Sequence, residues 1–276
     1  MSKFSVDWLN MREDADLRAR DSSLLDYAQK FLTSQNAIDA EITVVDLGAG
    51  TGSTINAFSK LGSRWEEKLH WRLVDSNKDL LEEAVRRYED SSYFQVFNLD
   101  LNKVLTLPLD GAKLITASAL MDLVSAEFID AFLEILQRIC KQRPIGFYSA
   151  LSYDGVISWT PRHFLDDDVL RIFNQHQRSD KGFGIALGAE ANHYLEQKLE
   201  SAGFKVLSAD SPWMLSSSEA NLVVKFVDGV AHAVEETLLL DSALLLEWVE
   251  YRKKNVSGGT CIVTHKDIFA LPLLKS

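Results

Sequence analysis

The sequence contains the stretch ITVVDLGAGTG at residues 42–52. Its first four residues are apolar or β-branched, and an amphipathic run that includes Ile55, Ala57 and Phe58 follows it. This order predicts a buried strand, a glycine turn and a helix. Gly48 and Gly50 allow a tight turn and leave room for a ligand where a Cβ atom would collide. The turn therefore suits an adenosine-type ligand.

The spacing of the glycines narrows the class of ligand that the turn can bind. A dinucleotide fingerprint is G-x-G-x-x-G and places a pyrophosphate over the helix N-terminus. Here Asp46 comes just before the first glycine, where an acid repels phosphate and attracts an amino group. The segment Asp46–Gly52 resembles motif I of the class I S-adenosylmethionine-dependent methyltransferases. The resemblance implies a Rossmann-like, doubly wound seven-stranded sheet, S-adenosylmethionine as cofactor, and cofactor contacts from Asp46, Gly48, Ala49 and Gly50.

A second strand, residues 69–75, ends in an acid. Folds of this type place a carboxylate there, half of a βαβ unit after the glycines, and it binds the ribose hydroxyls. Two vicinal hydroxyls donate two hydrogen bonds, and a carboxylate accepts both. We therefore expect Asp75, with its neighbour Ser76, to hold the ribose; the alternative is an acid that only caps the next helix.

A third strand, residues 93–97, leads into Asp100 and Leu101. The resemblance implies that an acid here accepts a hydrogen bond from the adenine amino group and that flanking apolar residues enclose the ring. Asp100 and Leu101 match these positions. An ordinary Asx-turn at Asp100 is the alternative.

Two further strands, residues 112–119 and 144–151, flank an amphipathic helix at 125–141. The repeated strand–helix alternation indicates a doubly wound parallel sheet. Ser118 is expected beside the methionine part of the cofactor. Asp122 is expected to cap the helix that begins near Ser125, and a contact with the cofactor is the alternative. An Asn/Asp-Pro-Pro-aromatic element is absent here, which disfavours methylation of adenine N6 or glutamine.

Residues 5–34 have apolar residues at helical spacing and carry several arginines. An arginine fork is well shaped to hold a carboxylate, and the methionine part of the cofactor carries one. Arg20, or alternatively Arg12, is the candidate to bind the methionine carboxylate of the cofactor. A solvated amphipathic helix is the competing interpretation. We expect a single domain, 1–276, with a helical cover (1–40), a cofactor-binding half (41–151) and a substrate-side half (152–276).

The segment after the fifth strand is expected to leave the sheet at its ligand-binding edge. His163 and Tyr153 are therefore the candidates for a general base that deprotonates a hydroxyl acceptor. Three tryptophans are candidates for the wall of a small acceptor site: Trp8, Trp159 and Trp213. No metal site is predicted, because three consecutive acids at 166–168 cannot all point one way and are suited to the start of a helix.

The last part of the chain departs from the simplest form of the resembled fold. Lys181–Gly184 is expected to be a flexible turn, and helix 187–202 and strand 204–210 follow it. A helical insertion at about 215–256, with runs at 217–236 and 241–254, then precedes the last strand. The second run is strongly apolar, which suits core packing, a homodimer surface or a lid over the acceptor pocket.

Composition limits the partners and the compartment. The formal net charge of −11 disfavours a nucleic-acid substrate, because phosphate binding needs a basic face. The sequence has no apolar run of the ~20 residues that a membrane span needs. Two distant cysteines predict free thiols in a reducing compartment, so a cytoplasmic protein with a small-molecule acceptor is expected. Two other functions stay open: a nicotinamide-dependent oxidoreductase, and a non-catalytic member that binds the cofactor or a partner.

Overall fold

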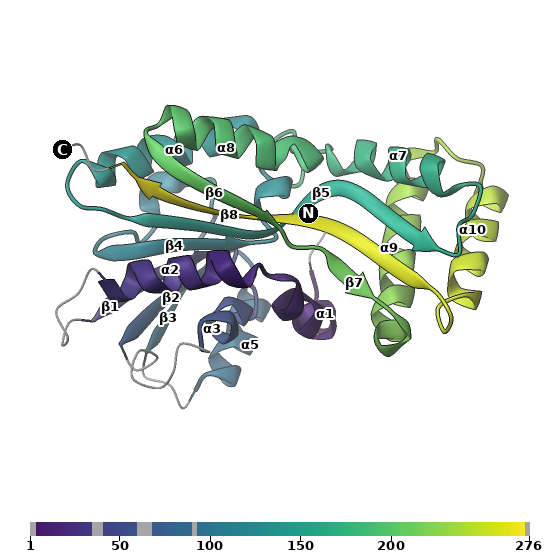
Figure 1. The fold of residues 1–276 in the computed structure, drawn as a ribbon, viewed down its shortest axis with the longest axis horizontal. Coiled ribbons are helices and arrows are strands. Elements are labelled where there is room, and N and C mark those ends of the chain that lie inside the picture. The colour runs from purple at the N-terminus through teal and green to yellow at the C-terminus, as the bar shows by residue number, and fades with distance from the viewer. Residues whose placement is uncertain (1–3, 35–40, 60–67, 90–92, 274–276) are drawn as a thin grey trace.

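The structure is a computed structural model that describes residues 4–34, 41–59, 68–89 and 93–273. One mixed sheet runs through it, with the strands in the order β3-β2-β1-β4-β5-β8-β6 (Figure 1). The strands are β1 (Ile42–Leu47), β2 (Leu69–Asp75), β3 (Phe94–Asn98), β4 (Ala112–Ser118), β5 (Gly146–Thr160), β6 (Phe204–Asp210), β7 (Trp213–Leu215) and β8 (Thr260–Pro272).

The sheet is parallel from β3 to β5, and β8 pairs antiparallel with both β5 and β6. The strand order reverses between β1 and β4, and ligands bind in the crevice at such a switch point. The predicted Rossmann-like, doubly wound sheet is confirmed. The short strand β7, which pairs with β8, is an additional eighth strand that the sequence did not predict.

Helices cover both faces of the sheet. They are α1 (Val6–Ala19), α2 (Ser22–Ser34), α3 (Ser53–Phe58), α5 (Lys78–Arg87), α6 (Ala126–Cys140), α7 (Asp166–Gln177), α8 (Ala191–Ser201), α9 (Ala220–Thr237) and α10 (Ser242–Lys254). Helices α6 and α8 pack on one face, and α2, α3 and α5 pack on the other (Figure 1). Of the helices that the structure describes, none combines the length and apolar character needed to cross a bilayer.

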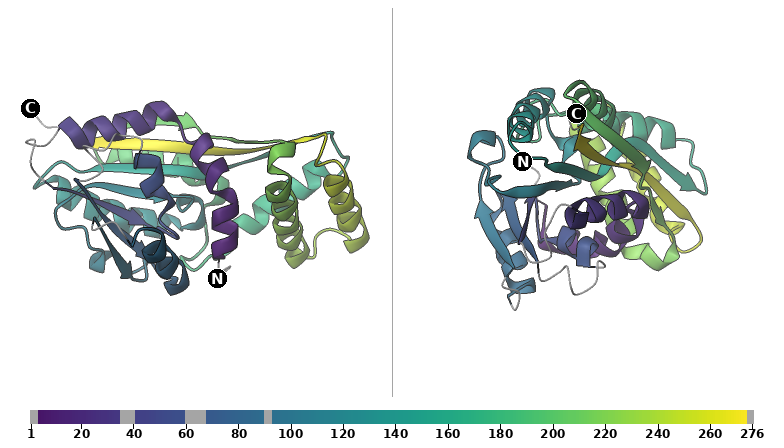
Figure 2. Two further views of the ribbon diagram at one scale, coloured as in Figure 1. Left: turned by 90° about the horizontal axis from the view of Figure 1, so that it is seen from below. Right: turned by 60° about the vertical axis from the view of Figure 1, so that its left-hand side comes forward.

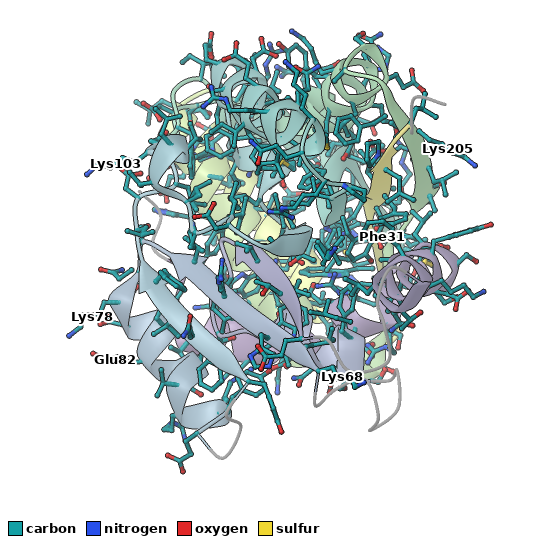
Figure 3. All side chains as sticks on the ribbon, turned by 90° about the vertical axis from the view of Figure 1, so that its left-hand side faces the viewer. Phe31, Lys68, Lys78, Glu82, Lys103 and Lys205 are labelled. Atoms are coloured by element: carbon teal, nitrogen blue, oxygen red, sulfur yellow. The ribbon has the colours of Figure 1, made fainter. Side chains whose placement is uncertain are left out.

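The central strand β1 is buried on both faces, which explains its continuous apolar sequence. Val44 belongs to the core under α2, and the next residue, Val45, belongs to the core under α6. Figure 3 labels Phe31 on α2; its ring packs 6.3 Å from that of Phe269 on β8, measured between centroids. By contrast, Lys78 and Glu82 pair at 3.0 Å on the exposed side of α5, at the edge of the molecule (Figure 3).

The predicted helical segment 5–34 is two helices, not one. Helix α1 ends at Arg20, whose backbone is extended (φ −53°, ψ 134°), and Asp21 then accepts the backbone N–H of Leu24 to start α2. The break turns the chain from the carboxyl edge of the sheet, where α1 lies, onto the face covered by α2 (Figure 2). Apolar spacing alone does not reveal such a break, because both helices keep the same pattern.

Strand β5 continues well beyond residue 151, where the sequence placed its end. It runs for 15 residues to Thr160 and pairs with β8 over most of that length. Together with β7, these strands form a long ribbon that carries α7, α9 and α10 away from the main body (Figure 2). The predicted insertion helices are confirmed as α9 and α10. The expectation that the chain leaves the sheet after residue 151 is wrong, because residues 152–159 continue β5.

Candidate functional site

A cavity of about 360 Å³ opens at the carboxyl ends of β1 to β4. Its walls come from the glycine turn, from residues after β2, β3 and β4, and from helix α1 and the segment around Lys181. This is the crevice that the strand order predicts. Eight of the ten expected cofactor-binding residues line it: Gly48, Ala49, Gly50, Asp75, Ser76, Asp100, Leu101 and Ser118.

The glycine turn is tightly enclosed by helix α1. Gly50 has φ +55°, and a Cβ atom added there would lie 2.9 Å from Cδ1 of Leu9. Such a distance is well inside the usual 3.5–4.0 Å separation of carbon atoms. The turn therefore needs glycine both for its backbone conformation and for the close approach of α1.

The Gly50→Ala variant is expected to lower the free energy of unfolding by about 1–2 kcal/mol from the left-handed backbone, with a further loss from the Leu9 contact. Gly111→Ala is the matched control, because Gly111 has φ +74° and no atom within 4 Å of its Cβ position. Urea denaturation of both variants separates the two effects. Equal losses would show that α1 does not press on the turn.

The Asp75 carboxylate is fixed at the end of β2 by backbone donors. Oδ2 accepts the N–H of Gly50 at 2.9 Å, and Oδ1 accepts the N–H of Asn77 at 2.8 Å. Burial raises the pKa of Asp75, and these amides together with that of Ser76 oppose the rise. Each carboxylate oxygen can accept a further hydrogen bond, so the group is set to receive a diol from the cavity. Asn77, not Asp75, caps α5 through its side chain.

At the end of β3, Asp100 forms the Asx-turn that was the alternative interpretation, and it also lines the cavity. Its Oδ1 accepts the backbone N–H of Asn102 at 3.0 Å and the Asn102 side-chain amide at 3.1 Å, which is an Asx-turn. Asp100 and the buried Leu101 nevertheless both line the cavity. An acid and an apolar side chain thus stand side by side in the cavity wall.

Arg20 and Asp46 lie beneath the cavity and do not line it. Arg20 donates from Nη2 to Ser118 Oγ at 2.9 Å, and Asp46 accepts a hydrogen bond from Thr116 Oγ1 at 2.7 Å. Burial raises the pKa of Asp46 to about 6, and its side chain is only 1% exposed. Through Ser118, which does line the cavity, Arg20 supports the floor of the site.

Arg12, the alternative arginine, does line the cavity. Its Nε lies 3.2 Å from Oδ2 of Asp16, one turn further along α1. Asp16 also lines the cavity, and its Oδ1 accepts Nε1–H of Trp213 at 2.9 Å. The cavity is therefore lined by a cation that is paired with Asp16, and Trp213 in turn holds Asp16 in place.

Similar solved structures are methyltransferases and related enzymes. A SAM-dependent methyltransferase from Aquifex aeolicus is 16% identical (TM-score 0.45; 98% of this chain, 100% of that one). A mycolic acid cyclopropane synthase complexed with SAH and CTAB is 12% identical (TM-score 0.47; 89% of this chain, 83% of that one). The YcgJ protein of Bacillus subtilis is 14% identical (TM-score 0.49; 92% of this chain, 100% of that one). No protein-family model matches the chain, and neither does any curated protein. At these identities and TM-scores, the similarities do not establish an activity for this chain.

The two candidate bases do not line the cavity. Tyr153 donates its hydroxyl to Asn174 Oδ1 at 2.8 Å, and burial raises its pKa, as does the nearby Asp122. His163 packs against the rings of Phe164 and Tyr251, each with a centroid distance of 4.6 Å. Because β5 continues past residue 151, both residues belong to the ribbon and its helices.

The candidate tryptophans also lie outside the cavity wall. Trp159 packs against Trp248, 5.8 Å away between ring centroids, in the core of the extension. Trp8 and Trp213 pack against each other at 6.4 Å. Of the three, Trp213 is the one that bonds a cavity residue, since it donates to Asp16.

Lys181, Phe183 and Asp16 are cavity residues that the sequence did not single out. The expected turn at Lys181–Gly184 brings Lys181 and Phe183 to the cavity, although more than 100 residues separate them from the glycine turn. A lysine before a glycine, and an aromatic residue between two glycines, do not by themselves indicate a binding site in the sequence. Only the path of the ribbon and α7 brings this segment back to the crevice.

Proposed function

We propose that the chain binds S-adenosylmethionine in this cavity and transfers its methyl group to a small-molecule acceptor. The carrying observation is the Asp75 carboxylate, which two backbone amides fix in the cavity wall beside the glycine turn. Asp75 would accept the ribose hydroxyls, Asp100 and Leu101 would receive the adenine, and Arg12 and Ser118 would stand near the methionine part.

The cofactor supplies a methyl group on a sulfonium, which is already strongly electrophilic. The protein's task is then to align an acceptor with the S–CH3 axis and to exclude water, and alignment alone contributes several kcal/mol. Helix α1 serves this role by covering the turn; Glu13 on α1 accepts from Asn56 at 2.6 Å and pairs with Arg87 at 2.8 Å. Direct in-line displacement is therefore the mechanism that we propose.

A small acceptor fits the charge of the cavity. Its lining includes Asp16, Asp75, Asp79 and Asp100 against three cations, Arg12, Lys78 and Lys181. A nucleic-acid strand needs a basic track for its phosphates, and this lining does not supply one. We propose a cytoplasmic setting, because both cysteines are free thiols, as expected in a reducing compartment.

Calorimetry with S-adenosylhomocysteine, and separately with NADH, tests the proposal. We expect saturable binding of S-adenosylhomocysteine to one site and no binding of NADH. Tight NADH binding without S-adenosylhomocysteine binding would favour the oxidoreductase instead. No binding of either ligand at millimolar concentration would contradict the assignment of the cavity, and cofactor binding without turnover across a broad acceptor panel would favour a non-catalytic member.

A further inference from the structure

One of the three cations in the cavity wall, Lys181, forms no ion pair with any described residue. The other two are matched by acids: Arg12 lies 3.2 Å from Asp16, and Lys78 lies 3.0 Å from Glu82. Lys181 is half-buried, so its ammonium has lost part of its water without gaining a carboxylate. A charge that is removed from water is stabilised by an opposite charge. The wall is therefore prepared for an anion at this point.

The extension holds the amine of Lys181 in place. Nζ donates to the backbone oxygen of His176 at 3.1 Å, in the last turn of α7, and it lies 3.4 Å from Nδ1 of the same residue. Nε2 of His176 lies 2.8 Å from Oε2 of Glu236 on α9, which fixes the ring. An ammonium has three N–H donors, and His176 occupies at most two of them. One donor is left for a ligand.

The charges around Lys181 place it beside the turn that follows β4. Burial lowers the pKa of Lys181, and the carboxylates of Glu236 and Asp122 oppose the decrease without cancelling it. Asp122 lies in that turn and is 8% exposed. It does not cap α6 as we expected, because Ser125 supplies the cap by accepting the N–H of Phe128 at 3.2 Å.

This side of the cavity lies away from the proposed nucleoside contacts. The ribose acid, Asp75, ends β2, whereas Asp122 follows β4, on the other side of β1. A nucleoside held at β2 and β3 leaves the β4 side for the acceptor. Phe183 adds an apolar surface to the wall next to Lys181, and its ring is held edge-on by Phe128 at 5.2 Å between centroids.

We propose that Lys181 binds a carboxylate of the methyl acceptor and that Phe183 packs against its apolar part, so that the acceptor is a small carboxylic acid. A single negative charge matches the single unpaired cation. A doubly charged phosphate fits less well, because Asp16, Asp75 and Asp100 share the wall. The inference rests on the proposed function and adds to it the chemical class of the acceptor. The simpler alternative is a lysine that only binds a carbonyl at the end of α7.

Binding measurements on the protein saturated with S-adenosylhomocysteine test the inference without the natural acceptor. The probes are benzoate, phenylacetate and hexanoate, each compared with its neutral amide by ligand-observed NMR titration. At least one acid should bind about tenfold more tightly than its amide, the gain typical of a charge-assisted contact. If no acid binds, or if every amide binds as tightly as its acid, the inference is wrong.

The variant Lys181→Met should lose this preference for the acid and keep its Kd for S-adenosylhomocysteine within about threefold. Lys205→Met is the matched control, since it removes the same charge from an exposed position on β6, and it should keep the preference (Figure 3). A folded Lys181→Met protein that still prefers the acid would show that Lys181 only supports the end of α7. A clearly larger loss of S-adenosylhomocysteine affinity would show that Lys181 binds the cofactor's own carboxylate, and either result overturns the inference.

A crystal of the unaltered protein with S-adenosylhomocysteine and the tightest-binding acid covers the case in which Lys181→Met does not fold. A carboxylate oxygen of the acid is expected within about 3.2 Å of Lys181 Nζ. An acid bound at Arg12 instead would overturn the inference and leave the proposed function in place. Failure of S-adenosylhomocysteine to bind at all would overturn the proposed function.

Discussion

Replacing Asp75 with alanine is expected to weaken the binding of S-adenosylhomocysteine by about 1–3 kcal/mol, which is roughly 5- to 150-fold in Kd. The variant removes the acceptor for the ribose hydroxyls. It also leaves the Gly50 and Asn77 amides without their present partner, so the turn that faces the ligand loses its support. Isothermal titration calorimetry of both proteins gives the difference directly.

A thermal melt must accompany this measurement, since the loss of two backbone contacts also affects stability. Asp168→Ala is the matched control, because Asp168 is an exposed acid on α7 that pairs with Arg171. It should leave the affinity unchanged. An Asp75→Ala protein that folds and binds with unaltered Kd would show that the ribose lies elsewhere.

The cofactor side of the site could be predicted because its signals are local in the sequence. Asp75 is the last residue of a parallel strand, and Gly50 and Asp100 follow within three residues of the end of one. The carboxyl ends of neighbouring parallel strands meet at one edge. Knowing where each strand ends is therefore enough to bring these residues together. The same argument placed Ser118 correctly at the cavity.

The acceptor side could not be predicted in this way. The pair Asp154-Gly155 has the composition of a turn, but Gly155 (φ +92°) lies at an irregularity within β5, and a Cβ atom there would meet Ala189 at 2.7 Å. A glycine at a bulge and a glycine in a turn look alike in the sequence. Because β5 continues, Tyr153 and His163 lie in the extension, and Lys181 and Phe183 line the cavity instead.

The choice between Arg12 and Arg20 also depended on information that the sequence lacks. The two residues are eight positions apart, so on one continuous helix they would point in similar directions. The helix ends at Arg20, and its extended backbone turns that side chain under the sheet edge, toward Ser118. Arg12, still within α1, is the one that lines the cavity.

Replacing Asp166 with alanine is expected to lower the free energy of unfolding by about 3–5 kcal/mol, the usual cost of leaving one member of a buried ion pair without its partner. Asp166 pairs with Arg252, and the two side chains are 8% and 3% exposed. It also accepts Nε1–H of Trp248 at 2.9 Å and the backbone N–H of His163 at 2.8 Å. The guanidinium lies 5.0 Å from the Trp159 ring, so it cannot turn to solvent without opening the core of the extension.

Asp167→Ala provides the matched control one residue away. Asp167 pairs with Arg162 at 2.7 Å, but these side chains are 81% and 72% exposed, so its loss should cost less than about 1 kcal/mol. Urea denaturation followed by tryptophan fluorescence suits both variants, because Trp159 and Trp248 report directly on this core. Equal losses in the two variants would mean that Arg252 finds another partner and that the ribbon with α7, α9 and α10 does not depend on the buried pair. A large loss at Asp166 with unchanged binding of S-adenosylhomocysteine to the folded protein would instead show that the extension is stabilised separately from the cofactor side of the cavity.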